Sequence, residues 1–472
     1  MGRLAQFLIA FAMMRVATTM LSPAEMGRIS LVMTTVSFFA MFLINPVGMF
    51  INRRLHAWKQ SGVAACYLKN YIGYLLMTSM IASVGVVAIC ISGAVDFGLS
   101  LTWLIVIVCG SLLFNTLNQT AIPSLNLLGN SLTFVLLSLA TMTASFAGAL
   151  ALAKIVQPAA QYWMLGLIIG QAVIGVVGAE ILFRNIQPKA QVYKNPKIQV
   201  GHLQVLFNFA WPIAISAGLG WVQGQGYRFV IHGHLGLAQL GLFAAGYGIS
   251  AGMISAFESV VTTYFQPRLY RDVCIQDADG HARAWHRYAA AVIPSLILTV
   301  ALVIILAPEL THVLVGEKFQ SASEYVLWGA LAEAARVLMG IYSLIAHVLM
   351  RTRWLVVPSI VGAALSITLV IIFVPTLGAA GAGLGLVLAG FAVVATMHGS
   401  LARHVGGGPS MRPVALASAA AALMWGMTIG TRAVFGTWGW YYIGGVMALV
   451  GSTYLIFQYL FLRQHFTDGG RT

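Results

Sequence analysis

The chain has 472 residues, of which 59% are hydrophobic and only 8% are charged. This balance excludes a water-soluble globular protein, in which about a quarter of the residues carry a charge. In lipid every backbone polar group must pair within the protein, so spanning segments are helices or closed barrels. The apolar runs approach the ~20 residues that a helix needs to cross a bilayer, and they lack the alternation of barrel strands. The sequence therefore predicts an all-α polytopic membrane protein.

Fourteen apolar segments are candidate transmembrane helices. They lie near residues 4–20, 30–51, 67–92, 101–127, 131–153, 162–183, 205–227, 239–265, 288–307, 324–349, 354–374, 378–402, 413–431 and 439–462. The first is the weakest because it is short and carries Arg15. No small-residue cleavage site follows it, so we expect it to be a span and not a signal peptide.

The net charge of +14 is mostly a sign of orientation. With a cytoplasmic N-terminus, 19 of the 26 lysines and arginines fall in cytoplasmic segments and 5 in outer segments or outer helix ends. Cytoplasmic loops are the ones enriched in positive charge. We therefore expect a multi-pass protein of the bacterial inner membrane with both termini in the cytoplasm. Nucleic-acid binding needs a clustered basic face on a soluble surface, which the sequence lacks, so no nucleic-acid partner is expected.

An internal repeat divides the chain. Residues 21–30 and 49–55 align with residues 235–244 and 263–269 at a constant offset of 214. The identical pairs are Leu21/Leu235, Ala24/Ala238, Gly27/Gly241, Arg54/Arg268 and Leu55/Leu269. Six spans separate the copies, so both halves enter the membrane from the same side as a parallel repeat. The expected domains are an N-lobe at 1–184, a cytoplasmic linker at 185–204, a C-lobe at 205–404, and two appended spans with a tail at 405–472.

The repeated block itself predicts helix starts. Ser22, Pro23 and Glu25 have the order of a capping box, in which Ser22 caps the helix and Glu25 reaches back to the cap amide. In the second copy Gly236 takes the cap position and Gln239 that of Glu25. Gly27 and Gly241 then allow close helix contact, as small residues do in membranes.

These motifs resemble a known family. An L-x-P-x-E-x-G turn at 21–27, the basic turn after the second span and the degenerate second copy are similar to Wzx-type polysaccharide-biosynthesis flippases. These belong to the multidrug/oligosaccharidyl-lipid/polysaccharide exporter superfamily. Tyr227 and Arg228 before HLGLAQLGLFAAGY resemble that family's seventh-helix pattern, although Tyr227 stands where an acidic residue is common. The resemblance implies two six-helix lobes around a central cavity. It also implies translocation of an undecaprenyl-diphosphate-linked oligosaccharide.

Two arginines, Arg15 in the first span and Arg228 near the outer end of the seventh, are candidate substrate ligands. A charge in lipid costs at least ~2.5–3.5 kcal/mol, so each needs a partner or a wet cavity. Arg15 and Arg228 nearly superpose under the repeat, with a one-residue slip. A guanidinium binds phosphate through two parallel hydrogen bonds, so a basic pair suits a diphosphate or an acidic sugar. The alternative is that each arginine caps a helix or reaches the membrane interface.

The second half carries its own charges within predicted spans. Glu333 and Arg336 lie on one helix face, where they form either a self-neutralising pair or an ion-coupling and head-group site. Glu258 stands alone in its span, so it is either protonated or paired with an arginine across the bundle. We take Glu258 and Glu333 as ion-coupling candidates and Arg336 as a substrate ligand.

A polar cluster lies in the fourth span. Asn115, Asn118 and Gln119 share a helix face and suit either sugar hydroxyls or hydrogen bonds between helices. His347 and His398 are expected to be hydrogen-bonding or packing residues. Neither the four cysteines nor the loop aspartates Asp277 and Asp279 have metal-ligand spacing, so no metal and no cofactor are expected.

Several functions fit this pattern. The first is a lipid-linked oligosaccharide flippase, with membrane lipids, glycosyltransferases and a polysaccharide polymerase of the same pathway as partners. A flippase of the peptidoglycan lipid precursor also fits about fourteen spans. A drug or organic-cation antiporter would want acidic groups in its cavity, and the first half offers only Glu180 near an inner helix end. An enzyme would need a catalytic domain or a nucleophile–base constellation, neither of which is visible.

Overall fold

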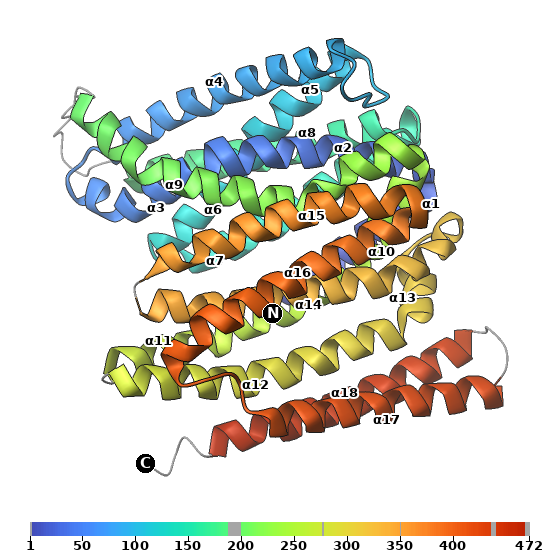
Figure 1. The fold of residues 1–472 in the computed structure, drawn as a ribbon. Helices are drawn as coiled ribbons and strands as arrows, with labels where there is room; N and C mark the ends of the chain where they lie inside the picture. Colours follow the sequence, from blue (N-terminus) through green and yellow to red (C-terminus); the bar gives the residue numbers. More distant parts are fainter. Residues whose placement is uncertain (1, 187–199, 276–277, 350, 436–439, 468–472) are drawn as a thin grey trace. The chain divides into compact units, whose positions relative to one another are not determined.

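The computed structural model describes residues 2–186, 200–275, 278–349, 351–435 and 440–467, and these are almost entirely helical (Figure 1). Within these described residues, eleven helical segments are long and apolar enough to cross a membrane, and two shorter apolar helices lie near the ends of the chain. One of the eleven, Gln204–Val273, is 70 residues long and contains two of the predicted spans. The prediction of fourteen spans in an all-α membrane protein is therefore confirmed.

The chain forms two compact units, Met1–Gly241 and Leu242–Thr472. The helix α9 belongs to the first unit because it packs along α3 and the π-helical turn η1. Most of the predicted linker, residues 187–199, lies outside the described residues. The predicted lobe boundaries at 184 and 205 stay a prediction.

The first unit contains the helices up to the start of α10. They are α1 (Gly2–Met20), α2 (Pro23–Phe39), η1 (Ala40–Ile44), α3 (Asn45–Gln60), α4 (Ala64–Ile91), α5 (Leu101–Gly110), η2 (Ser111–Asn115), α6 (Thr116–Leu127), α7 (Ser131–Ile155), α8 (Ala160–Ile186), α9 (Val200–Gln225) and α10 (Tyr227–Tyr264). Small residues bring α7 and α8 together, since a Cβ at Gly148, Gly166 or Gly170 would strike the backbone of the other helix. The second and fourth spans each contain a π-helical turn, η1 and η2, a distortion that is frequent at functional sites.

The repeated glycines pack against each other. A Cβ on Gly27 of α2 would collide with the carbonyl oxygen of Leu237, and a Cβ on Gly241 would collide with that of Pro23. The two contacts are equivalent under the repeat. The prediction that these glycines allow close helix contact is confirmed. Each glycine lies against the backbone of the other copy of the repeat.

The capping prediction is confirmed only for Ser22. Its side-chain oxygen accepts a hydrogen bond from the Glu25 amide at 3.3 Å. Glu25 does not reach back to the cap as predicted. One carboxylate oxygen pairs with Arg28, and the other accepts from the Ala160 amide at 2.5 Å. The N-terminus of α8 lacks intrahelical partners for its first amides, so a carboxylate there is stabilised.

The seventh span ends close to the predicted residue 227, since α9 ends at Gln225. The helical path is interrupted for one residue at Gly226 and continues as α10 to Gly236, where φ is 79° and ψ is 179°. Only glycine adopts that conformation at little cost. The break therefore lies at Gly236, the predicted cap position, and the eighth span follows it to Tyr264.

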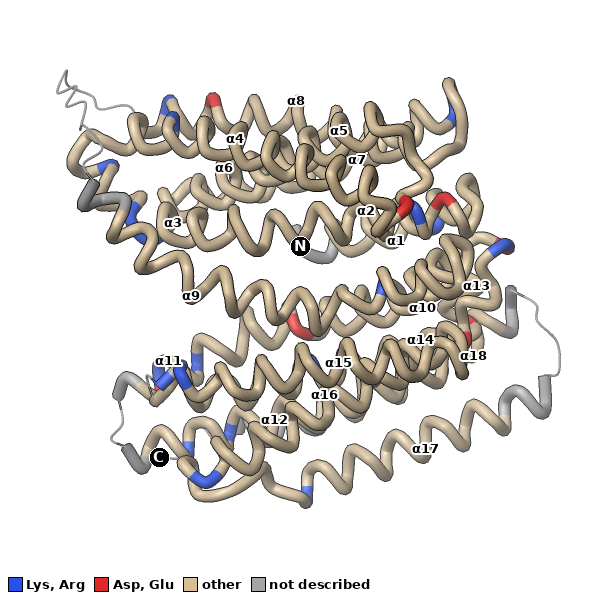
Figure 2. Tube along the Cα trace, turned by 45° about the horizontal axis from the view of Figure 1, so that its top comes forward, with Lys and Arg blue, Asp and Glu red and all other residues tan. Residues whose placement is uncertain are grey.

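The second unit contains the rest of α10 and the later helices. They are α11 (Gln266–Ile275), α12 (Ala278–Ile305), α13 (Ala307–Leu314), η3 (Glu317–Ala322), α14 (Ser323–Val348), η4 (Thr352–Leu355), α15 (Val356–Leu377), α16 (Ala379–Leu401), η5 (Ala402–Val405), α17 (Met411–Phe435) and α18 (Trp440–Thr467). Its packing centres on α12, which contacts α14 and also the appended helices α17 and α18. In both units, charged residues lie mostly near helix ends (Figure 2).

Candidate functional site

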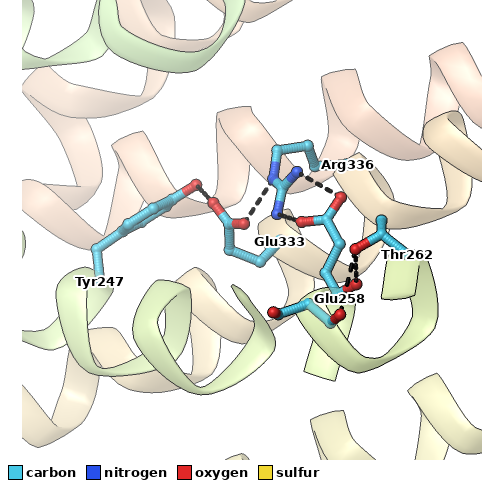
Figure 3. A network of polar contacts seen from close by, with 6 residues as sticks. Tyr247, Glu258, Thr262, Glu333 and Arg336 are labelled. Atoms are coloured by element: carbon cyan, nitrogen blue, oxygen red, sulfur yellow. Dashed lines mark hydrogen bonds and ion pairs between the residues drawn. The ribbon is translucent and has the colours of Figure 1, made fainter. Parts of the chain in front are cut away.

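A charged network joins α10 and α14 in the second unit (Figure 3). The Arg336 guanidinium lies between two carboxylates. It donates from Nε to Glu333 at 2.7 Å and from its two Nη atoms to Glu258 at 2.8 and 3.3 Å. The Tyr247 hydroxyl donates to the other Glu333 oxygen at 2.7 Å. Of the two alternatives for Glu258, the structure shows pairing with an arginine of another helix, and that partner is Arg336.

Helix geometry explains how these side chains meet. Glu333 and Arg336 are one turn apart on α14, and Tyr247 and Glu258 are about three turns apart on the same side of α10. Glycines let the two helices approach, because a Cβ on Gly246 would strike the Ala322 carbonyl just before α14 and a Cβ on Gly329 of α14 would lie 2.9 Å from the Tyr247 Cα. Ser250 then donates to the Val326 carbonyl at 2.7 Å. The network therefore rests on tight packing of α10 against α14.

The network holds one cation and two anions. With all three groups ionised its net charge is −1, which is costly within a membrane. The Glu333 side chain is only 8% exposed, against 36% for Glu258 and 44% for Arg336. A proton or a small cation that joined the network would cancel the excess charge. With all three groups ionised, the network is thus one positive charge short of neutrality.

In the first unit Arg228 is tied to α2. Its Nη1 donates to the Thr34 hydroxyl at 2.6 Å and its Nε to the Tyr227 hydroxyl at 3.2 Å. Arg15 is half-buried on α1. Arg15 lies seven residues before Ser22, and Arg228 lies eight residues before Gly236, roughly 10–12 Å along each helix. Arg15 is five residues from the end of α1 and Arg228 is the second residue of α10, and their joint contact with a substrate stays a prediction.

The polar cluster of the fourth span is divided. Asn118 is buried and links three helices: its Nδ2 donates to the carbonyls of Phe114 at 2.8 Å and Gln171 at 2.6 Å, and its Oδ1 accepts from Thr141 at 3.1 Å. Gln119 is exposed and donates to the Asn115 side chain at 3.1 Å. Asn115 closes the π-helical turn η2. Asn118 therefore positions helices, while Asn115 and Gln119 retain hydrogen-bonding capacity.

Of the two histidines expected to pack or to form hydrogen bonds, His398 has a hydrogen-bond partner in the structure. His398 Nδ1 is hydrogen-bonded to the Tyr342 hydroxyl at 2.8 Å, as expected for a hydrogen-bonding histidine. Among the described residues no group of three or more His, Cys, Asp and Glu side chains could hold a metal ion. Asp277 lies outside the described residues.

Tyr247 and Thr34 were not predicted as members of either site. Both are uncharged residues in apolar helices. Each binds a charged side chain of another helix, and this contact is visible only in the tertiary structure. The tyrosine ends the repeat-adjacent run HLGLAQLGLFAAGY, which was the one available signal.

The comparisons with known proteins agree with a transporter fold. The chain matches the family described as "Polysaccharide biosynthesis protein" over residues 16–324, about two thirds of its length. No curated protein sequence matches it significantly. Among solved structures it is similar to the Lipid II flippase MurJ in an inward closed conformation, with a TM-score of 0.71, 13% identity and coverage of 98% of this chain and 99% of that one.

Two further similar structures are MATE multidrug resistance transporters of the MOP superfamily. The inward-facing one has a TM-score of 0.58 and 14% identity, and covers 86% of this chain and 95% of its own. The outward-facing one has a TM-score of 0.51 and 14% identity, and the match covers 86% of this chain and 93% of that transporter. At these identities the likeness concerns the fold, which is that of membrane flippases and transporters. The chain is thus a multi-pass membrane protein that belongs to the polysaccharide biosynthesis protein family.

Proposed function

We propose that this protein flips an undecaprenyl-diphosphate-linked oligosaccharide across the bacterial inner membrane by alternating access. The product would serve cell-surface or exopolysaccharide synthesis. The observation that carries the proposal is the match to a polysaccharide biosynthesis family in a chain with the fold of a lipid flippase. Glycosyltransferases would supply the substrate and a polymerase would consume it. We assign no catalytic residue, because translocation makes and breaks no covalent bond.

Each candidate residue has a distinct role in this proposal. Arg15 and Arg228 contact the diphosphate, since guanidinium groups bind phosphate through two hydrogen bonds. Asn115 and Gln119 bond sugar hydroxyls, and Asn118 holds their helix in place.

In the second unit, Glu258 and Glu333 couple transport to a proton or a cation. Arg336 uses three of its five N–H donors on these carboxylates and keeps the others for the substrate head group.

The direct test is reconstitution. Purified protein in vesicles is given a fluorescent polyprenyl-diphosphate-linked oligosaccharide in one leaflet, and its appearance in the other leaflet is followed by chemical quenching. We expect translocation well above that of empty vesicles. Arg228→Gln should reduce the rate, whereas Arg353→Gln, a basic residue in the turn before α15, should not. Translocation no faster than in empty vesicles would contradict the proposal.

A peptidoglycan lipid-precursor flippase is the second candidate. It is favoured by the TM-score of 0.71 to a Lipid II flippase over almost the whole chain. Complementation of a strain depleted of its own such flippase separates the two candidates. Growth of that strain would favour the second candidate.

The multidrug antiporter is less well supported by the charges. A cationic drug needs available carboxylates, and Arg336 already pairs with both Glu258 and Glu333. Drug resistance in a pump-deficient host would revive this alternative.

A further inference from the structure

The first unit contains a cavity of about 290 Å³ between α3, α4 and α9. Five of the residues that line it are aromatic: Phe50, Trp58, Tyr67, Tyr71 and Tyr74. Its volume is near the lower end of the ~300–1,000 Å³ typical of small-molecule sites. We call it the aromatic pocket.

The walls of the aromatic pocket are held in place. The Tyr71 hydroxyl is hydrogen-bonded to Thr120 at 3.2 Å, and the Tyr74 hydroxyl donates to the Leu43 carbonyl at 2.7 Å. Trp58 stacks on Tyr67 with ring centroids 4.3 Å apart and planes 15° apart. The pocket is therefore pre-formed, which lowers the entropic cost of binding.

Polar groups lie at the rim of the same pocket. Arg54 is exposed and its guanidinium lies 5.3 Å from the centre of the Phe50 ring. It forms no ion pair with a carboxylate in the described part of the chain. Asn70 is also exposed and lines the pocket. The neighbouring basic residues Arg53, Lys59 and Lys69 add to a positive potential that favours an anionic ligand.

The lining distinguishes between ligand classes. A lipid chain needs only aliphatic walls, which Val47, Ile51 and Leu206 supply in part. Flat aromatic faces instead suit the C–H faces of a sugar ring, and an amide at the rim suits its hydroxyls. A guanidinium beside them suits a phosphate. A sugar next to a diphosphate combines all three features, and it occurs at the junction of a lipid-linked glycan.

We propose that the aromatic pocket is a docking subsite for the sugar–diphosphate junction of the substrate. The diphosphate lies on Arg54, and the first sugar ring lies against the aromatic wall with its hydroxyls toward Asn70. The inference rests on the proposed function. It adds a loading position at the helix ends that positive charge assigns to the cytoplasm, where such a lipid is made. The transmembrane arginines Arg15 and Arg228 are separate from this subsite.

The test measures binding of a short polyprenyl diphosphate that carries one N-acetylhexosamine. Titration calorimetry on the full-length protein in detergent gives the Kd. We expect Arg54→Gln to raise the Kd about tenfold, as for loss of a charged hydrogen bond, and Arg54→Lys to raise it less. Tyr67→Leu should weaken binding of the sugar-bearing probe but not of the sugar-free diphosphate. Arg403→Gln, an exposed arginine of the second unit that does not line the pocket, is the control and should leave the Kd unchanged.

Three outcomes overturn the subsite. They are an unchanged Kd in Arg54→Gln, equal binding of sugar-bearing and sugar-free probes to the wild type, and equal competition by phosphatidylglycerol. Melting temperatures of the variants show whether a lost signal reflects unfolding, and Arg54→Lys keeps the test valid if Arg54→Gln is unstable. If wild-type vesicles flip the oligosaccharide and Arg54→Gln matches them in rate and Kd, only the subsite fails. If the wild type neither binds nor flips the substrate, the proposed function fails with it.

Discussion

Single buried side chains hold the helices of this protein in their positions. Asn118 is the clearest example, because its amide bonds to α8 and accepts from Thr141 of α7. A hydrogen bond between membrane helices contributes on average about 0.6 kcal/mol. A Cβ on Gly175 would lie 2.6 Å from the Asn118 amide nitrogen, so that glycine leaves the space for it. The polarity of this residue is thus used for helix positioning.

Asn118→Leu should lower the stability of the protein by about 1–2 kcal/mol, because two interhelical bonds and one within the helix are lost. Unfolding in mixed detergent micelles measures the change. Gln119→Leu is the control, since this exposed side chain bonds only to Asn115 in its own span. Equal destabilisation by both variants would contradict the positioning role.

The carboxylates of the α10–α14 network provide the second prediction at this scale. Glu258→Gln and Glu333→Gln keep the side-chain shape but can no longer take up a proton or bind a cation by charge. We expect transport driven by an imposed ion gradient to fall to roughly the rate without a gradient, while substrate binding remains. Transport into vesicles with and without the gradient is the measurement.

Glu324→Gln serves as the control, because this residue is an exposed carboxylate at the start of the same helix. It should retain the full response to the gradient. A gradient response that survives in both Glu258→Gln and Glu333→Gln would exclude these residues from coupling.

Helix contacts in this protein depend on glycine at the repeated block. Gly27 and Gly241 each face backbone of the other copy, so no side chain fits at either position without movement. In lipid there is no hydrophobic driving force between helices, because lipid tails are as apolar as the side chains. Membrane helices therefore associate through close packing, which small residues allow. The repeat therefore marks the place where its two copies touch.

Gly27→Ala should cost about 1–3 kcal/mol, the usual range for overpacking. Thermal unfolding and the flipping rate should both show the defect. Gly220→Ala is the control, since a Cβ there meets nothing within 4 Å. The double variant with Gly241→Ala should cost less than the two single costs together, because the first substitution already separates the helices. Additive costs would mean that the two glycines act independently.

Gly236 affects the path of α10 through its backbone conformation. Its φ of 79° is unfavourable for any residue with a Cβ, although a Cβ there would meet no neighbouring atom. Gly236→Ala should therefore destabilise the protein by about 1–2 kcal/mol. Gly233→Ala, three residues earlier in the helix, should be neutral or stabilising by about 0.5–1 kcal/mol. Equilibrium unfolding measures the stability of both variants. A Gly236→Ala variant as stable as the wild type would contradict the claim that the positive φ at this position requires glycine.

The orientation of the whole molecule is predicted from its charge distribution. Because 19 of the 26 lysines and arginines fall in segments that would share one side of the membrane, the positive-inside rule predicts that both termini are cytoplasmic. Alkaline phosphatase fused after the C-terminus should be inactive, and the same enzyme fused near Asp96, between α4 and α5, should be active. A green fluorescent protein fused at the same places should show the opposite pattern. An active phosphatase at the C-terminus would contradict this orientation.

The number and position of the spanning helices were predictable because they depend on a local property. A run of apolar residues either matches the thickness of the bilayer or it does not, whatever its neighbours are. The break inside α10 depends on backbone conformation, since glycines stand at 226 and 236 and only the second has positive φ. The charged candidates were also evident, because intramembrane charges are few.

The partners of those charges were decided by the tertiary structure alone. Helices that are apolar on all sides show no preferred face in sequence, so the rotation of each helix depends on the helices that pack against it. That rotation brings Tyr247 to Glu333, Thr34 to Arg228 and Glu25 to the start of α8. It also gathers aromatic residues of α3 and α4 beside α9 to form the aromatic pocket. Composition and hydropathy thus predict a polytopic helical protein with a repeat and a few intramembrane charges, whereas the packing of the helices determines what each charge binds.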